Sequence, residues 1–323
     1  MDNINTMAFS GEIPWHKKGK QLAGLATAEE MIVAAGLDWR VEMKPLYYQE
    51  GFAIDPLANY RAGDFFGCIR QDTNATLSVM KGGYTPMQNR HKFQFMDSVV
   101  GAGQAVYETA GALGRGEKVW ILVRLPGEII VAKDDVVRKY LTLYDSFDGT
   151  MAVGLMRTGI RVVCENTLNE AISSSKQKVK FRHTKGAKMR LEDLQETLGL
   201  VHKQYDHFGE ASRYMAGQAL MRNRAQDLLK EILKTQVAPP GMPVNRSEMT
   251  HNKVMDLFEG QGRGSTMVGS RGTAWGLYNA VTEYVDFHRA TRGKNQDDRR
   301  TASLLFGSGA ALKQRAWNLL QLA

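Results

Sequence analysis

Seven cationic side chains gather in one short stretch of the sequence, which we call the basic tract. No acidic residue interrupts it between positions 176 and 190, and Phe181 and His183 stand among the cations. Cations neutralise phosphates, and aromatic rings stack on unpaired bases for roughly 1–3 kcal/mol per base. This combination suits single-stranded nucleic acid, although a solvated linker has the same composition. The cations are Lys176, Lys178, Lys180, Arg182, Lys185, Lys188 and Arg190.

Three more arginines stand where they can approach a phosphate backbone. Arg161 opens an expected helix directly before the tract, and Arg263 and Arg271 lie in the loop GQGRGSTMVGSRGT. That loop lacks the Lys of a P-loop and follows an expected helix rather than a strand, so nucleotide hydrolysis is not expected. The loop is either a basic contact for nucleic acid or a disordered connector.

No catalytic or metal-binding constellation is apparent. The seven His are scattered, no GxSxG motif occurs, and Cys68 and Cys164 are expected to be buried thiols. Asp145 and Asp148 flank Ser146 and suggest a metal-dependent nuclease as an alternative, but turn chemistry already explains the Asp148-Gly149 pair. We therefore expect a binding protein without cofactor, metal or catalytic residues.

The charge of the chain is distributed unevenly. Residues 1–160 hold 17 Lys and Arg against 18 Asp and Glu, whereas residues 161–323 hold 25 against 16. All the excess positive charge lies in the second half, which favours a polyanionic partner. No apolar run approaches the roughly 20 residues of a membrane span, and no signal peptide is recognisable, so a cytoplasmic protein without a membrane contact is expected.

The first half of the sequence predicts the sheet that positions these residues. Alternating apolar residues predict three strands from Trp39 to about residue 80, and four more in a meander within residues 105–158. The first two strands of the meander are expected to turn at Gly114-Arg115-Gly116. Helices are expected at residues 28–35, with a capping box of Thr27 and Glu30, and at residues 161–175. A further helix is expected at residues 88–101, with an apolar face of Phe93, Met96, Val99 and Val100. Residues 7–22 lack a period and are expected to form an irregular arm.

From Leu191 onward the sequence is strongly helical. Leu, Val, Tyr and Phe recur at spacings of three and four through residues 191–208, a second helix follows near residue 222, and prolines break the pattern near residue 240. Helices are also expected from residue 274 and in the tail, interrupted at Gly307 and Gly309. The fold class is α+β: an antiparallel β-meander with flanking helices, then a mostly helical, basic C-terminal half. The expected domains are residues 1–175, 176–236 and 237–323.

Four segments of the chain resemble the phage/plasmid-like family of uncharacterised mobile-element proteins. They are WHKKG (15–19), YLTLYDSFDGTMAVGLMRTGIRVVCENTL (140–168), WGLYNAVTEYVDFHR (275–289) and LLFGSGAALKQRAW (304–317). The order of elements, with a helix, a meander and a further helix before basic residues, is also similar to single-strand annealing proteins such as RecT, Red-beta and the eukaryotic Rad-type protein. The first resemblance implies a prophage or plasmid setting and the second implies annealing.

Together these features lead us to expect single-stranded DNA binding and strand annealing in phage or plasmid recombination. The expected partners are further copies of the chain and a phage exonuclease or single-strand binding protein. Two alternatives stay open: an accessory protein that binds a host protein through the helices of residues 191–234, and the nuclease using Asp145 and Asp148.

Overall fold

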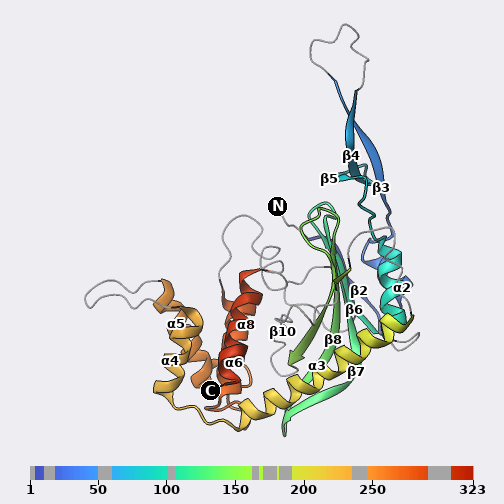
Figure 1. Cartoon of the computed structure of the whole chain (residues 1–323). Coiled ribbons are helices and arrows are strands. Elements are labelled where there is room, and N and C mark those ends of the chain that lie inside the picture. The colour runs from blue at the N-terminus through green and yellow to red at the C-terminus, as the bar shows by residue number, and fades with distance from the viewer. Residues whose placement is uncertain are drawn as a thin grey trace. The chain divides into compact units, whose positions relative to one another are not determined.

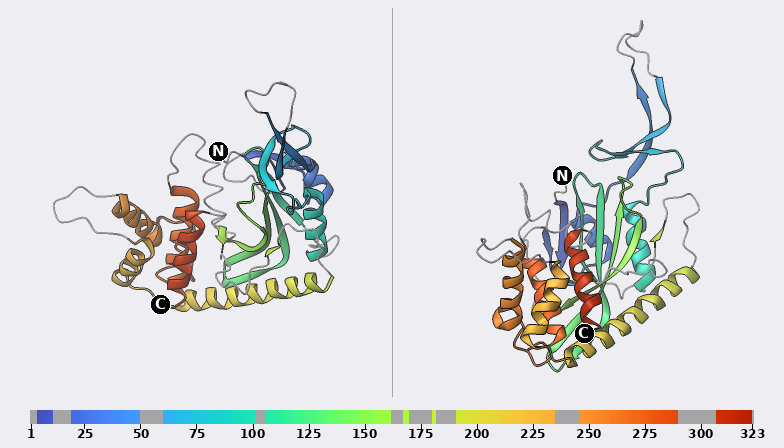
Figure 2. Two further views of the ribbon diagram at one scale, coloured as in Figure 1. Left: turned by 45° about the horizontal axis from the view of Figure 1, so that its top comes forward. Right: turned by 60° about the vertical axis from the view of Figure 1, so that its left-hand side comes forward.

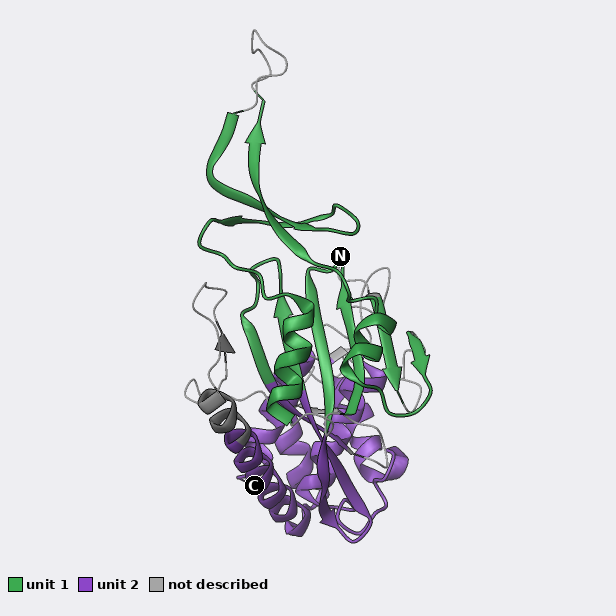
Figure 3. Ribbon diagram, turned by 90° about the vertical axis from the view of Figure 1, so that its right-hand side faces the viewer, with its two compact units in different colours: residues 1–124, 142–155, 178–198 green, residues 125–141, 156–177, 199–323 purple. Residues whose placement is uncertain are grey.

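The computed structural model of the chain describes residues 4–10, 19–49, 60–100, 106–161, 167–169, 180–181, 191–234, 246–289 and 307–322 (Figure 1). The chain divides into two compact units, each built from three separate segments (Figure 3). Unit 1 comprises Met1–Arg124, Thr142–Leu155 and Lys178–Leu198, and unit 2 comprises Leu125–Leu141, Met156–Gln177 and Gly199–Ala323. The α+β class is confirmed, because antiparallel sheets precede a mostly helical part.

The larger sheet contains the predicted meander. Its strand order is β10-β9-β8-β7-β6-β1-β2, with β11 paired to β9. Tight turns join its consecutive central strands, and the first turn uses Gly114 and Gly116 at φ of 69° and 119°, which glycine adopts without strain. These strands are β6 (Val106–Leu113), β7 (Lys118–Ala132), β8 (Asp135–Ser146) and β9 (Val153–Arg161).

The start of the chain joins this sheet instead of forming an irregular arm. β1 (Ile4–Ser10) pairs antiparallel with β6, with Ala8 opposite Ala110, and parallel with β2 (Lys20–Leu22). Because Met7, Ala8 and Phe9 are all buried, β1 shows no alternation of apolar and polar residues. That missing alternation is why the prediction of an irregular arm was wrong for residues 7–10 and 20–22.

The helix expected at residues 161–175 is also wrong where the structure describes it. β9 continues to Arg161, and β10 (Thr167–Asn169) pairs antiparallel with it, placing Thr167 opposite Ile160. The chain therefore reverses direction between those strands. Thr167 is β-branched and favours a strand over a helix, and this preference outweighs the apparent helical spacing around it. Residues 162–166 and 170–175 lie outside the described residues.

Two helices of unit 1 match their predictions. α1 (Ala28–Ala34) begins with the capping box, in which the Glu30 backbone N–H donates to Thr27 Oγ1 at 3.3 Å and the Thr27 backbone N–H donates to the Glu30 carboxylate at 2.9 Å. α2 (Asn89–Val100) buries the predicted face of Phe93, Met96, Val99 and Val100. The two helices pack against each other.

The three strands predicted after Trp39 form a separate small sheet in unit 1. Its strands are β3 (Val41–Tyr48), β4 (Tyr60–Arg70) and β5 (Thr76–Lys81), paired antiparallel in the order β3-β4-β5. Asn74 makes the β4–β5 turn with φ of 55°. Cys68 in β4 is buried, as predicted, whereas Cys164 lies outside the described residues.

The helical part of the chain contains the predicted long helix. α3 (Leu191–Gly217) runs without a break (Figure 2), and its residues Val201, Tyr205 and Phe208 are buried. The Tyr205 hydroxyl accepts from the Tyr140 backbone N–H at 2.6 Å and lies 2.8 Å from the Thr158 carbonyl oxygen, so the helix bonds to β8 and β9. The other described helices are α4 (Arg222–Leu233), α5 (Arg246–Asp256), the π-helix η1 (Leu257–Gln261), α6 (Ala274–Glu283), the π-helix η2 (Tyr284–His288) and α8 (Ser308–Leu320).

α6 is the central helix of unit 2. All ten of its residues are buried. Trp275 Nε1 donates to Asp135 Oδ2 at 2.8 Å, and the Phe208 ring stacks on Trp317 at 4.8 Å. Gly307 precedes α8 and Gly309 lies inside it, so Gly309 does not interrupt the helix.

Within the described ranges, none of the helices combines the length and the apolar character that crossing a membrane requires.

Candidate functional site

Two residues of the basic tract belong to the described sheet. Lys180 and Phe181 form β11, which pairs antiparallel with β9 through Gly154 and Val153. The backbone of the tract therefore adds a short strand to the meander within unit 1. The remaining cations of the tract lie outside the described residues; they are Lys176, Lys178, Arg182, Lys185, Lys188 and Arg190.

The three other predicted arginines lie in unit 2. Arg161 is the last residue of β9, and only its backbone is described. The Arg263 backbone N–H donates to Glu283 Oε2 at 2.9 Å, and its guanidinium carbon lies 4.8 Å from the centre of the Phe287 ring. Arg271 is exposed.

The glycine-rich loop is ordered, and it is not a phosphate cradle. A cradle needs several backbone N–H groups that point at the ligand. Here the N–H groups of Gly262, Ser265 and Ser270 donate to carbonyl oxygens of Leu257, Gly262 and Met267 at 2.9–3.1 Å. The Ser265 hydroxyl donates to the Gly262 carbonyl oxygen at 2.6 Å. The loop therefore offers exposed arginine side chains rather than a ring of free donors.

A buried ion pair occupies the position of the predicted nuclease carboxylates. Lys92 Nζ lies 2.8 Å from Asp145 Oδ2, and neither side chain has exposed surface. Lys92 also donates to Asn89 Oδ1 at 3.0 Å and lies 3.9 Å from the centre of the Phe147 ring. Burial lowers the pKa of Lys92, because desolvation penalises its charge more than Asp145 restores it.

Asp148 does not share this environment. Its Oδ1 accepts from the Thr150 backbone N–H at 2.9 Å, as expected of a turn residue. No group of three or more His, Cys, Asp or Glu side chains suited to a metal ion occurs in the described part of the chain. The two carboxylates thus have separate protein partners, which does not favour the nuclease alternative.

The side chains around the ion pair make a closed structural centre. The Ser78 hydroxyl donates to the Phe147 carbonyl oxygen at 2.5 Å, and the Tyr84 hydroxyl donates to the Ser146 carbonyl oxygen at 3.2 Å. Burial raises the pKa of the neighbouring Cys68 thiol to about 11. A thiol with so high a pKa is mostly protonated at neutral pH, so Cys68 is a poor nucleophile.

Cations and aromatic rings alternate next to the ion pair. The Arg70 guanidinium carbon lies 4.5 Å from the centre of the Trp39 ring, and the Trp39 and Phe147 ring centres lie 5.5 Å apart. Lys92 covers the Phe147 ring, so the stack joins β4 to α2 and to the turn after β8. Sequence reasoning missed it because its four members are separated by up to about a hundred residues and only tertiary packing brings them together.

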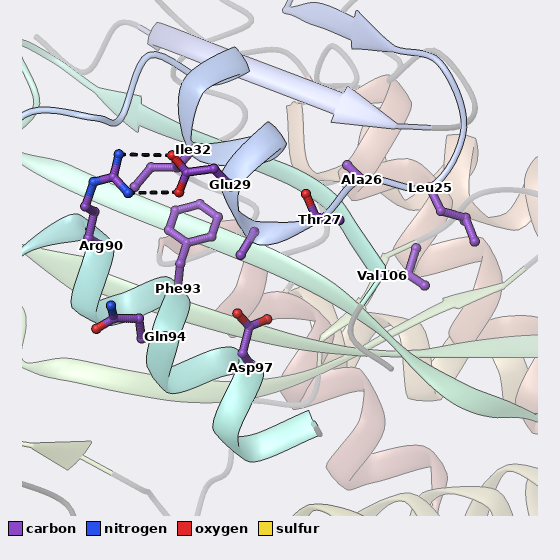
Figure 4. A pocket seen from close by; sticks show the side chains of 11 residues that line it. Leu25, Ala26, Thr27, Glu29, Ile32, Arg90, Phe93, Gln94, Asp97 and Val106 are labelled. Carbon is purple, nitrogen blue, oxygen red and sulfur yellow. Dashed lines mark hydrogen bonds and ion pairs between the residues drawn. The ribbon is translucent and has the colours of Figure 1, made fainter. Parts of the chain in front are cut away.

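A pocket of about 470 Å³ opens between α1 and α2 of unit 1 (Figure 4). On one side Arg90 makes two hydrogen bonds to the Glu29 carboxylate, at 2.8 and 3.1 Å, and a third to Asp38 at 2.9 Å. On the other side Asp97 Oδ1 accepts from the Tyr107 hydroxyl at 2.7 Å. The apolar lining residues are Leu25, Ala26, Ala28, Ile32, Phe93 and Val106.

The pocket has the size of a small-molecule site but few unoccupied polar groups. Glu29 and Arg90 neutralise each other, and Asp97 is already bonded to Tyr107. The pocket residues come from three separate stretches, so no spacing in the sequence indicated them. We therefore assign the pocket no role in nucleic-acid binding.

Comparison with known proteins gives one match. Neither the curated proteins nor the solved structures contain a significant match to this chain. The model of a protein family described as Domain of unknown function (DUF932) matches residues 76–305. That range includes α2, the whole meander, the basic tract, α3 to α6 and the glycine-rich loop. Because the match spans more than half of the sequence, the chain belongs to the DUF932 family.

Proposed function

We propose that this protein binds single-stranded DNA and promotes the annealing of complementary strands, without catalysing a covalent step. The observation that carries the proposal is the pairing of β11, the described part of the basic tract, with β9 of the meander. An extended backbone fixed along a sheet can hold neighbouring cations at strand spacing, about 3.3 Å per residue. Cations so spaced suit the phosphates of an extended strand.

The charge of the tract sets the expected strength of this binding. It holds seven cations and no acid, and most of the excess positive charge of residues 161–323 lies in it. For single strands, the logarithm of the binding constant falls with the logarithm of salt by about 0.7 per neutralised phosphate. If all seven cations bind phosphates, the slope is about −5. Arg161, Arg263 and Arg271 are additional phosphate contacts in the proposal.

The proposed setting is recombination in phages or plasmids. The four segments that resemble mobile-element proteins support this setting. Two of them, residues 140–168 and 275–289, lie entirely within the range that the DUF932 model matches. Annealing requires long strands to be held extended, so the protein is proposed to act as a homo-oligomer. A phage exonuclease or a single-strand binding protein would supply its substrate.

The described contacts favour this proposal over a host-protein contact through residues 191–234. The apolar residues of α4 are already buried; they are Ala225, Leu228, Leu229 and Ile232. α4 packs against α5 and α8. Residues Val201, Tyr205 and Phe208 of α3 are equally buried. Among residues 199–234, these apolar side chains therefore lie inside unit 2 and are not available to a partner.

A salt series on labelled oligonucleotides tests the proposal. Fluorescence anisotropy would follow binding to a single strand and to the matching duplex, and a strand-pairing assay would follow annealing. We expect tighter binding to the single strand, a steep loss of affinity with salt and faster pairing of complementary strands. Absent binding, or affinity that does not change with salt, would refute it.

A further inference from the structure

The small sheet has one face on which most of the described side chains are exposed. In an antiparallel pair, residues directly opposite each other project from the same face. Lys44 is opposite Gly67, which is opposite Val79, and Phe65 is opposite Lys81. Glu42 and Ile69, also opposite each other, fall on the same side. We call the surface of Glu42, Lys44, Leu46, Phe65, Ile69, Val79 and Lys81 the outer face.

The other side of the same sheet packs inside unit 1. Val41, Cys68 and Arg70 project there, with exposed fractions of 4%, 0% and 6%. The Ser78 hydroxyl, opposite Cys68, bonds to the Phe147 carbonyl oxygen. By contrast, Phe65 and Val79 on the outer face are 46% and 53% exposed. A sheet with one buried side normally shows polar residues on the other, so two large exposed apolar side chains call for an explanation.

These apolar residues form one continuous patch. Phe65 and Val79 are diagonal neighbours across β4 and β5, within reach of each other on a pleated sheet. Gly67 separates Phe65 from Ile69 along β4, and a Cβ built on Gly67 would lie 3.0 Å from Ile69 Cδ1 and 3.3 Å from Leu46 Cδ2. Leu46 and Ile69 therefore fill the space above Gly67 and join the patch across all three strands.

The charges around the patch do not suit nucleic acid. Lys44 Nζ lies 3.6 Å from Glu42 Oε2, and Lys81 is opposite Phe65. Both signs of charge therefore occur on the outer face. Residues 41–81 hold four Lys and Arg against five Asp and Glu, whereas the basic tract holds seven cations and no acid. An apolar centre with mixed charges at its border is typical of a protein interface.

We propose that the outer face binds the outer face of a second copy of this chain. A two-fold contact places the same surface on both partners and therefore requires self-complementarity. The outer face meets this requirement, because a lysine of one copy can approach Glu42 of the other while the apolar centres pack together. A surface that carried only one sign of charge would repel its copy.

The size of the outer face predicts how tight this dimer is. Three strands about 4.8 Å apart and roughly 26 Å long present a flat area on the order of 400 Å². A stable interface usually buries about 800 Å² on each partner. The contact is therefore expected to be concentration-dependent rather than permanent, with monomer and dimer exchanging in solution.

Sedimentation velocity of the full chain over a wide concentration range tests the contact. We expect the wild type to shift from monomer to dimer as its concentration rises. Phe65→Glu and Val79→Glu place a charge in the centre of the interface and should each weaken the dimer about ten-fold or more. Val33→Glu is the control, because Val33 is a 57% exposed apolar residue of α1, outside the outer face.

Charge-reversal variants test whether the outer face of one copy binds the outer face of another. Glu42→Lys alone, and Lys44→Glu with Lys81→Glu, should each form weaker dimers than the wild type, because two like-charged faces meet. An equimolar mixture of the two variants should form a mixed dimer, which differently labelled chains would reveal. Circular dichroism and thermal melting would establish that each variant is folded.

Two outcomes would overturn the proposal: a wild type that remains monomeric at every concentration, or a dimer that Phe65→Glu and Val79→Glu leave unchanged. The result is independent of DNA binding, because the basic tract is intact in these variants. Anisotropy with a short single strand, on which only one monomer fits, measures that binding separately.

Discussion

Lys92 Nζ and Asp145 Oδ2 lie 2.8 Å apart with no exposed surface on either side chain. Removing one partner of such a pair leaves an uncompensated charge in the interior and typically costs about 3–5 kcal/mol. We therefore expect Lys92→Met or Asp145→Leu to lower the free energy of unfolding by that amount in urea denaturation. Combining both changes should recover most of the loss, since no charge is then stranded. Single variants within about 1 kcal/mol of the wild type would contradict a buried ion pair.

The basic tract is the subject of the second prediction. Replacing Lys178, Lys180 and Arg182 with Glu should weaken single-strand binding and make the salt slope about 2 less steep, because three phosphate contacts are lost. Fluorescence anisotropy at several salt concentrations measures both effects. The matched control reverses three exposed lysines elsewhere, with the same change in net charge: Lys20, Lys203 and Lys234. Equal losses in the two triple variants would show that net charge, and not the tract, controls binding.

Much of the fold could be predicted from the sequence, and the errors share one physical cause. Thr27 with Glu30, the Gly114–Gly116 turn and the Phe93–Val100 face depend on neighbouring residues, so local patterns predicted them. β1 and β10 depend on partners elsewhere in the chain: Ala8 pairs with Ala110, and Thr167 pairs with Ile160. The spacing of apolar and polar residues within a short stretch of sequence does not indicate such long-range pairing.

The candidate site was predicted even less completely than the fold. Lys180 and Phe181 could be chosen by composition, but their pairing with Val153 and Gly154 could not. Asp145 was noticed for its charge, whereas its partner Lys92 is 53 positions earlier and is the fourth residue of an amphipathic helix. The sequence therefore did not indicate this buried ion pair, which only the structure revealed.

Cys68 gives a prediction about pH. Burial raises the pKa of its thiol from 9.0 to about 11, so the folded state prefers the protonated form. The protonated thiol therefore contributes fully to the stability of the folded state below pH 9. This contribution is lost as the pH rises from 9 to 11, because the thiol ionises at a lower pH in the unfolded chain than in the folded one. The total is roughly 2–3 kcal/mol. We expect the difference in unfolding free energy between the wild type and Cys68→Ala to shrink by about that amount over this range. A difference that does not change with pH would mean that the thiol is not desolvated.

Tyr205 is expected to matter through its hydroxyl alone. Tyr205→Phe keeps the ring but removes the buried hydroxyl that bonds to the Tyr140 backbone N–H and the Thr158 carbonyl oxygen, which costs about 1–3 kcal/mol. Chemical denaturation would measure this loss. Tyr214→Phe is the control, because Tyr214 lies on the same helix and is 51% exposed. DNA affinity should be unchanged in both variants, so a change in affinity would assign Tyr205 a further role.

The interleaving of the two units constrains how the chain acquires its structure during synthesis. β1 finds its partner β6 only after about a hundred further residues have been made, and unit 1 is completed only by Lys178–Leu198. Unit 2 begins inside β7, before unit 1 is finished, and needs the last helix. Such long-range closure slows folding. A ribosome that pauses before residue 178 would hold a nascent chain in which neither unit is complete. Because the segments of the two units alternate along the sequence, no contiguous fragment of the gene encodes either unit alone.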